Sequence, residues 1–197
     1  MSFINEKTKE VNCKVVYYGS PRCGKSTSLK SICKQVKKNS KGDLISLNQD
    51  DDRTLFFDFV PLTLGKYKNY SLRLHLYTVP GEMGYSQARS LTSKGVDGVV
   101  FVVDSQLDRM EANIQALQSL REILAKEGHD LSTVPLVFQY NKRDVQNALP
   151  VEEMRAVLSQ SLQGEGVETV ATEDVGTFQV LEKIAGKVLR SLKEKRD

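Results

Sequence analysis

Residues 19–26 read Gly19-Ser20-Pro21-Arg22-Cys23-Gly24-Lys25-Ser26. This stretch matches the pattern G-x-x-x-x-G-K-[ST], and it lies between the apolar run Val11 to Tyr18 and a stretch with helical character. Glycines at both ends let the backbone turn tightly, so that its N–H groups and the start of the next helix face a polyphosphate. Lys25 supplies mobile positive charge, and Ser26 offers a hydroxyl to Mg2+. The flanking strand and helix favour a nucleoside triphosphate site over a chance match to the pattern.

The composition is typical of a single globular domain over residues 1–197. Of the 197 residues, 40% are hydrophobic and 27% are charged, which is enough for one core. The net charge of +3 is mild. We interpret Lys37, Lys38, Lys41 and the basic run 193–196 as solvated helix ends, with an acidic partner or membrane surface as the alternative. No basic face is interleaved with aromatic residues, so nucleic-acid binding has little support.

The cysteines indicate a reducing compartment. Cys13, Cys23 and Cys33 lack metal-type spacing with His75 and His129, and reduced thiols in a cytosolic protein fit best. The sequence has no signal peptide or lipidation motif, and no apolar run approaches the ~20 residues that a membrane span needs. We therefore expect a cytoplasmic protein that has no membrane anchor of its own and is a monomer when alone.

The hydrophobic pattern predicts an α/β fold, because short β-rich runs alternate with longer amphipathic stretches. The expected strands are residues 11–18, 54–62, 72–78, 98–104, 136–140 and 167–171. The second and third strands are separated by a short Gly, Lys and Asn segment, which predicts a hairpin and hence a mixed sheet. Residues 40–53 and 80–94 have no assignment, and loops of that length are usually functional or mobile.

Two sets of apolar residues at helical spacing predict amphipathic helices that cover the sheet with core side chains. These residues are Leu107, Met110, Ile114, Leu117 and Leu124 in the first helix, and Phe178, Leu181, Ile184, Val188 and Leu192 in the second.

A second motif, Asn141-Lys142-Arg143-Asp144, follows the apolar strand 136–140, at the edge where α/β sheets bind ligands. The Asp144 carboxylate can accept from both the ring N–H and the exocyclic amine of guanine, whereas adenine would leave it unpaired. We expect Asn141 to tie this turn to the phosphate loop and the stem of Lys142 to cover the base. An ordinary charged turn is the alternative interpretation.

Together with Ala171-Thr172 in the place of a second guanine-contacting loop, these motifs resemble the Ras-like small GTPases over nearly the whole chain. Longer and rarer blocks resemble the bacterial MglA subfamily. They are Tyr17-Tyr18-Gly19, Asp52-Arg53-Thr54-Leu55-Phe56-Phe57-Asp58-Phe59 and Leu76-Tyr77-Thr78-Val79-Pro80-Gly81.

The resemblance implies a P-loop small-GTPase fold, with a mixed, mostly parallel sheet of about six strands and helices on both faces. It implies binding of GTP or GDP with Mg2+. The implied nucleotide-binding residues are Gly19, Ser20, Arg22, Cys23, Gly24, Lys25, Ser26, Thr27, Thr54, Gly81, Asn141, Lys142, Asp144, Ala171 and Thr172. The implied metal ligands are Ser26 and Thr54, and we add Asp58 as a further candidate from its place in the sequence.

The catalytic residues that the resemblance implies are Arg53, Gly81 and Glu82. Arg53 would stabilise charge on the transferred phosphoryl group, or else it only pairs with a neighbouring aspartate. Glu82 stands where small GTPases usually have a water-orienting glutamine, and an ionised carboxylate cannot donate a hydrogen bond. Alternatively, Glu82 points to solvent.

Two further departures from the usual sequence of small GTPases concern the phosphate loop and the metal site. Pro21 has no N–H to donate, and Arg22 either adds charge near the phosphates or faces a partner. Thr78 replaces the acidic residue that usually holds Mg2+ through water. Asp58 would compensate for this loss, or it pairs with a nearby lysine or arginine.

Because of Pro21 and Glu82, we expect a switch that hydrolyses GTP slowly. The resemblance implies that it controls cell polarity and gliding motility through effectors bound at two switch segments, and we expect its recruitment to a cell pole. The resemblance also implies a Roadblock-family, MglB-like activator as partner. One alternative is a hydrolysis-deficient, GTP-bound scaffold for polarity partners. An ATP-using phosphotransferase is a third hypothesis, and the Asn141 to Asp144 motif argues against it.

Overall fold

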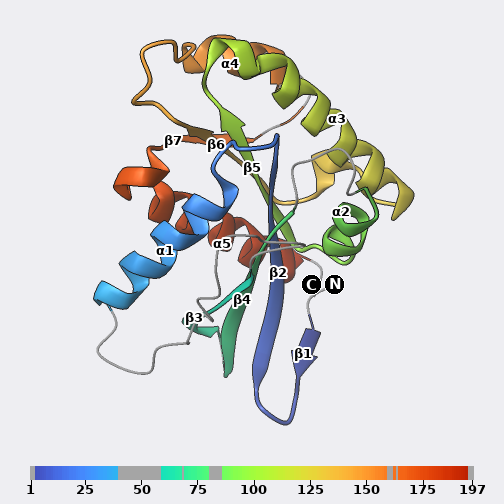
Figure 1. Ribbon diagram of the computed structural model, residues 1–197. Helices are drawn as coiled ribbons and strands as arrows, with labels where there is room; N and C mark the ends of the chain where they lie inside the picture. Colours follow the sequence, from blue (N-terminus) through green and yellow to red (C-terminus); the bar gives the residue numbers. More distant parts are fainter. Residues whose placement is uncertain are drawn as a thin grey trace.

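The computed structural model describes residues 3–39, 59–67, 69–79, 86–158, 162 and 164–194. Over these residues the centre of the molecule is a seven-stranded sheet in the order β3-β4-β2-β5-β6-β7, with β1 beside the first part of β2 (Figure 1). The strands are β1 (Phe3–Asn5), β2 (Glu10–Gly19), β3 (Phe59–Tyr67), β4 (Tyr70–Thr78), β5 (Gly98–Asp104), β6 (Leu136–Asn141) and β7 (Glu165–Glu168).

The sheet is mixed and mostly parallel, which confirms the expected fold class. Strand β2 runs parallel to β4 and β5, and β5, β6 and β7 continue in the same direction. Only the β1–β2 and β3–β4 pairs are antiparallel among the described strands. The carboxyl ends of the parallel strands therefore meet at one edge of the sheet, where α/β proteins bind ligands.

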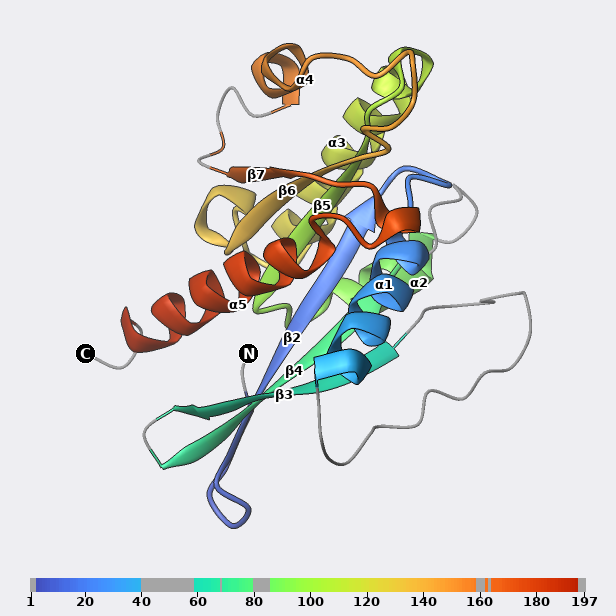
Figure 2. The same ribbon diagram turned by 90° about the vertical axis from the view of Figure 1, so that its left-hand side faces the viewer.

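Helices cover both faces of the sheet (Figure 2). Helices α1 (Lys25–Asn39) and α5 (Thr177–Glu194) pack on one face, and α3 (Met110–Lys126) and α4 (Val151–Leu158) pack on the other, with α2 (Ser86–Ser93) beside α3. Short 3-10 turns precede or link them: η2 (Leu107–Arg109), η3 (Leu131–Thr133) and η4 (Ala171–Glu173).

The strand sequences are apolar because both faces of the sheet are buried. In β2, Val15 and Tyr17 pack in the cluster under α1 and α5, whereas Val16 and Tyr18 pack in the cluster under α3 and α4. The same alternation divides β5, all of whose residues are buried. Successive side chains of a strand point to opposite faces of the sheet, so one strand contributes to both clusters; a helical period near 3.6 residues would not give this alternation.

The hairpin is confirmed, but its first strand ends later and its second strand begins earlier than expected. In the described part of the chain β3 covers Phe59–Tyr67 and so continues past residue 62, β4 begins at Tyr70 rather than Leu72, and the hairpin closes where Tyr67 pairs with Tyr70. Residues 54–58 lie outside the described part of the chain. Pairing with β4 determines where β3 ends, and such pairing leaves no local signal in the β3 sequence itself.

Other boundaries also need correction. Strand β7 covers Glu165–Glu168 rather than 167–171, because the chain then leaves the sheet and Ala171 begins η4. Leu107 does not belong to the buried stripe of α3, since it lies in η2 and is 63% exposed. Strand β1 and helix α4 were not predicted from the sequence, and α2 occupies part of the unassigned stretch 80–94.

Candidate functional site at the carboxyl edge of the sheet

The phosphate loop joins the end of β2 to the start of α1. Strand β2 ends at Gly19, and α1 begins at Lys25. Gly24 has a φ of 103°, a conformation that side-chain-bearing residues rarely adopt, and a Cβ atom there would collide with the amide of Asn141. The glycine therefore lets the loop approach β6 closely. Arg22 also has a positive φ, 60°, and its side chain is exposed.

The side chain of Lys25 lies inside the phosphate loop and bonds to its backbone. Its Nζ donates to the carbonyl oxygens of Gly19 (3.1 Å) and Ser20 (2.8 Å), and it lies 3.7 Å from the Sγ of Cys23. The residue is 7% exposed. An ammonium group has three donors, and a thiol sulfur is a weak acceptor. The donor aimed at Cys23 is therefore the one that an anionic oxygen in the loop would attract.

The first turn of α1 presents unsatisfied donors. Its first N–H groups have no acceptor within the helix, and the Ser28 N–H makes the bond back to the Gly24 carbonyl at 2.9 Å. Ser26 and Thr27 are half-buried, and among the described residues their hydroxyls have no hydrogen-bond partner. A helix N-terminus with free N–H and hydroxyl groups, next to a buried lysine, is suited to bind a phosphate and its cation.

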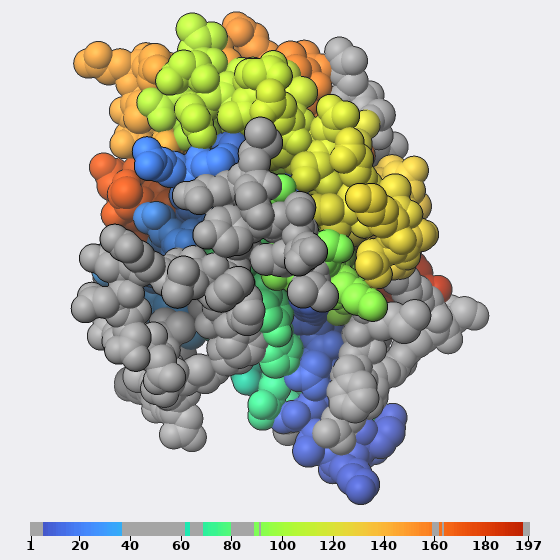
Figure 3. Space-filling view, turned by 45° about the vertical axis from the view of Figure 1, so that its right-hand side comes forward, coloured from blue at the N-terminus to red at the C-terminus, as the bar shows by residue number. Residues whose placement is uncertain are grey.

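Asn141, at the end of β6, joins three segments of the site. Its Nδ2 donates to the Cys23 carbonyl at 2.8 Å, and its Oδ1 accepts from the Thr169 hydroxyl and the Ala171 N–H, each at 3.0 Å. The tie between this turn and the phosphate loop that the sequence predicts is therefore present. In Figure 3 the blue segment that contains the phosphate loop and the start of α1 reaches the surface between the orange-red segment that contains η4 and the yellow-green start of α3.

The side chains of the Asn141 to Asp144 turn point in different directions. Lys142 has a φ of 63° and donates from Nζ to Asp104 at 2.5 Å and to Gln106 at 3.2 Å. Arg143 turns away to Glu168 and to the Leu149 carbonyl. Asp144 is exposed, and no described side chain is bonded to its carboxylate. Its acceptor oxygens are thus available for a ligand with adjacent N–H donors.

The chain matches the family model of the ADP-ribosylation factor family over residues 1–186. It is 52% identical to the Mutual gliding-motility protein MglA of Myxococcus xanthus (strain DK1622) over 194 residues, which are 98% of this chain and 99% of that protein. The chain is an MglA-like small GTPase of the ADP-ribosylation factor family.

More distant relatives lie in the same family of GTPases. A small COPII coat GTPase of Giardia intestinalis is 29% identical over 160 residues, which cover 78% of this chain and 69% of that protein. The human ADP-ribosylation factor-like protein 4A is 30% identical over 101 residues, or 51% of this chain and 47% of that protein.

Several residues that this MglA-like GTPase places at the site were not predicted from the sequence. Asp104 is completely buried at the end of β5, and Asn113 is completely buried on α3. Arg109, in η2, donates from Nη2 to the Pro21 carbonyl at 2.7 Å. One signal was available: Asp104 is the charged residue that ends the otherwise apolar strand Gly98–Asp104.

Other sequence-predicted residues are placed as follows. Ser20 is buried with its hydroxyl on Asn113, Ala171 is buried in η4, and Thr172 is exposed beside it. Thr78 is buried at the end of β4 and pairs with Tyr17 of β2. Arg53, Thr54, Asp58, Gly81 and Glu82 lie outside the described residues, so their roles stay predictions.

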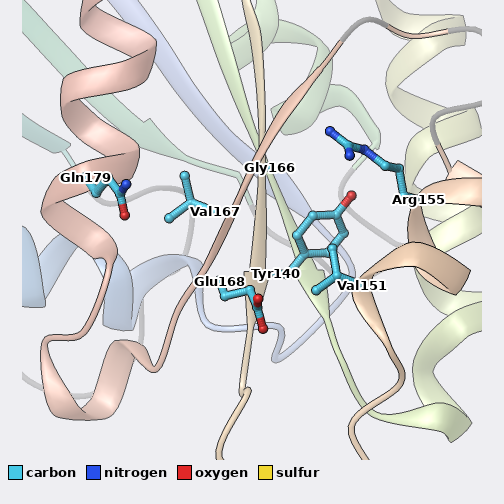
Figure 4. Close-up of a pocket in the computed structure, with 7 residues that line it drawn as sticks. All are labelled: Tyr140, Val151, Arg155, Gly166, Val167, Glu168 and Gln179. Carbon is cyan, nitrogen blue, oxygen red and sulfur yellow. The ribbon is translucent and has the colours of Figure 1, made fainter.

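Two cavities lie away from the phosphate loop. One of about 300 Å³ borders β7, with Tyr140 and Arg155 on one side of the strand and Gln179 of α5 on the other (Figure 4). The other, of about 600 Å³, lies near the start of β2 and includes Asn12 and His75. Neither is lined by a residue of 19–27. No helix in the described ranges is long and apolar enough to span a bilayer.

Proposed function

We propose that the chain is a guanine-nucleotide switch that binds GTP and GDP with Mg2+ and hydrolyses GTP slowly. The observation that carries the proposal is the double role of Asn141, whose amide holds the phosphate loop through Cys23 and the η4 segment through Ala171. These contacts unite a polyphosphate cradle with a turn that carries an available carboxylate. Such a combination suits a guanine nucleotide.

The nucleotide would be held at both of its ends. Lys25 and the first N–H groups of α1 would bind the phosphates. Asp144 would accept from the two adjacent N–H donors of guanine, and the stem of Lys142 would lie along the base. Gly19, Ser20, Arg22, Cys23 and Gly24 shape the loop, and Thr27, Ala171 and Thr172 border it.

The Ser26 hydroxyl, which has no hydrogen-bond partner among the described residues, supports a magnesium site, with Thr54 as a further ligand by motif position and Asp58 as an additional candidate. When bound, the ion neutralises charge on the phosphate oxygens. Oxygen ligands of this kind are the ones that Mg2+ prefers. Thr78, which stands in place of an acidic residue, brings no charge to the site, so the Asp58 carboxylate is the remaining candidate for it.

Three residues by motif position would carry hydrolysis. Arg53 would stabilise the charge of the transferred phosphoryl group, and the Gly81 N–H would contact a γ-phosphate oxygen. Glu82 orients water poorly while ionised, because it has no proton to donate and repels the phosphate. Hydrolysis is therefore slow without an activator. The competing candidate, favoured by Glu82 and Pro21, is a GTP-bound scaffold without turnover.

The 52% identity to the M. xanthus gliding-motility protein supports a proposal for the cellular role. We assign the chain to the control of gliding motility and cell polarity, with effectors that contact the two switch segments and a Roadblock-family, MglB-like protein as activator. We place it in the cytoplasm as a monomer that its partners recruit to a cell pole.

The test begins with the nucleotide that co-purifies with the protein, which we expect to be GDP or GTP. Multiple-turnover phosphate release is then compared among the wild type, Glu82→Gln and Arg53→Ala, with and without an MglB-like activator. Replacing Glu82 with glutamine should raise turnover by about threefold or more, and removing Arg53 should lower it by at least about tenfold.

The outcomes separate the alternatives. A preference for adenine nucleotides, or no binding of either base with Mg2+ present, would refute the guanine switch. Nucleotide binding with no phosphate release under any condition would favour the scaffold. Turnover that neither substitution changes would leave the switch standing and remove the catalytic roles of Arg53 and Glu82.

A further inference from the structure

We propose that Arg109 is a positioning residue that couples the phosphate loop to the Asn141 to Asp144 turn through the buried carboxylate of Asp104. The two ends of a guanine nucleotide would then be bound cooperatively. This inference rests on the proposed function, and it concerns two residues, Arg109 and Asp104, that contact neither the base nor the phosphates by motif position.

Arg109 contacts the phosphate loop and Asp104 at the same time. Its Nη2 donates to the Pro21 carbonyl at 2.7 Å, and its Nε lies 3.7 Å from Oδ2 of Asp104. The Arg109 side chain is 31% exposed, whereas that of Asp104 is completely buried. The planar guanidinium presents several fixed donors, so one side chain can serve both acceptors.

Asp104 in turn contacts the turn from Asn141 to Asp144. The same Oδ2 atom accepts from Nζ of Lys142 at 2.5 Å. A buried carboxylate needs cations or strong donors, because water is not available to solvate it. Two cations from separate loops therefore share one oxygen, and the position of each loop affects the other.

A second path through Asn113 strengthens the connection. The Oδ1 atom of Asn113 accepts from the Ser20 hydroxyl at 3.1 Å and from the Asp104 N–H at 3.2 Å. Its Nδ2 donates to the Asp104 carbonyl at 2.8 Å. The backbone of Asp104 is thus fixed relative to Ser20, just as its carboxylate is linked through Arg109 to Pro21.

The phosphate loop needs this support at Pro21. Proline has no N–H, and the next residue, Arg22, has a φ of 60°, which costs energy for a residue with a side chain. The contact from Arg109 gives the Pro21 carbonyl a charged donor. Without it, the loop is free to relax, and Asp104 keeps fewer of its cationic partners.

Coupling predicts that Arg109 affects recognition of the base from a distance. Inosine diphosphate lacks the exocyclic amine that Asp144 would read, so the ratio of the dissociation constants for inosine and guanosine diphosphates measures that contact. If Arg109 holds the turn from Asn141 to Asp144 in the position that reads the base, Arg109→Met should reduce this ratio by about fivefold or more, within the usual range of coupling between sites.

The experiment titrates full-length protein, freed of bound nucleotide, with the two diphosphates at equilibrium in Mg2+. Arg109→Met is compared with the wild type and with Arg190→Met, a control at an exposed arginine of α5. Arg109→Lys keeps the charge but serves only one of the two acceptors. Its ratio should fall between those of Arg109→Met and the wild type, and it replaces Arg109→Met if that variant does not fold.

The results distinguish coupling from a merely structural role. A lower ratio in the Arg109 variants, with an unchanged ratio in Arg190→Met, supports the inference. Equal weakening of both diphosphates leaves the ratio unchanged and overturns it. If the wild type binds neither diphosphate, the proposed function itself fails, which is a separate and recognisable result.

Discussion

At Gly24 the backbone of the phosphate loop lies against the end of β6. The φ of 103° at this glycine and the nearby Asn141 amide leave no room for a side chain. The second glycine of the motif is therefore required by a tertiary contact as well as by the local turn. Gly24 and Asn141 belong to motifs that lie far apart in the chain, yet each constrains the other.

We predict that Gly24→Ala lowers the affinity for GDP by at least about tenfold and destabilises the fold by about 1–3 kcal/mol, because the loop must move away from Asn141. Equilibrium titration with GDP and urea unfolding measure the two effects. Gly186→Ala is the control: a Cβ at Gly186, within α5, meets nothing within 4 Å. Equal behaviour of the two variants would contradict the steric argument.

At the scale of elements, polar contacts join α1, α5 and the turn before α5. The Thr177 hydroxyl lies 2.7 Å from that of Ser31 and accepts from Nε2 of Gln35 at 2.8 Å. The same Gln35 amide also donates to the Asp174 carbonyl at 3.1 Å. Thr177 is completely buried, so this cluster fixes the start of α5, and with it η4, against α1.

Thr177→Val keeps the shape of the side chain but removes its oxygen. The Ser31 hydroxyl then keeps only its contact with the Gln35 amide, and that amide loses one of its acceptors, which should lower the free energy of unfolding by about 1–3 kcal/mol. Urea unfolding should show a lower midpoint with an unchanged slope. Thr63→Val, at an exposed position on β3, should stay within about 0.5 kcal/mol of the wild type. A wild-type midpoint for Thr177→Val would mean that the freed groups find new partners.

For the whole molecule, burial of both sheet faces places ionisable side chains in the core. Burial, aided by the negative charge of Asp97, raises the pKa of the Cys13 thiol to about 12. Burial also raises the pKa values of Tyr17, Tyr18 and Tyr140. Each of these groups is neutral in the folded state at neutral pH. Its burial therefore stabilises the fold only while the group keeps its proton.

Stability should therefore fall at alkaline pH. An unfolded thiol loses its proton near a pKa of about 8.5, whereas folded Cys13 keeps it, so the unfolded state binds fewer protons above that value. The contribution of Cys13 is present below about pH 8.5 and is lost as the pH approaches its folded pKa of about 12. Urea unfolding between pH 7 and pH 11, with reductant present, should show a decline that is smaller in Cys13→Ala. An unfolding free energy that does not change across this range would contradict the prediction.

Much of the fold and of the site could be predicted from local sequence patterns. The phosphate loop is contiguous, and its glycines, lysine and serine act within one turn and the helix that follows. The stripe from Phe178 to Leu192 predicted α5, because helical spacing directly reflects which side of a helix is buried. The turn from Asn141 to Asp144 was likewise recognisable, because an apolar strand precedes it.

Only the tertiary structure decided the features that depend on segments distant in the chain. The end of β3 at Tyr67 follows from its register with β4, and neither strand alone carries that information. The contacts from Pro21 through Arg109 and Asp104 to Lys142 bring together residues that are far apart in the sequence. Local sequence specified a helix, a strand or a phosphate loop because those contacts are between neighbours. The partners of a buried charge are instead chosen by the packing of the whole sheet.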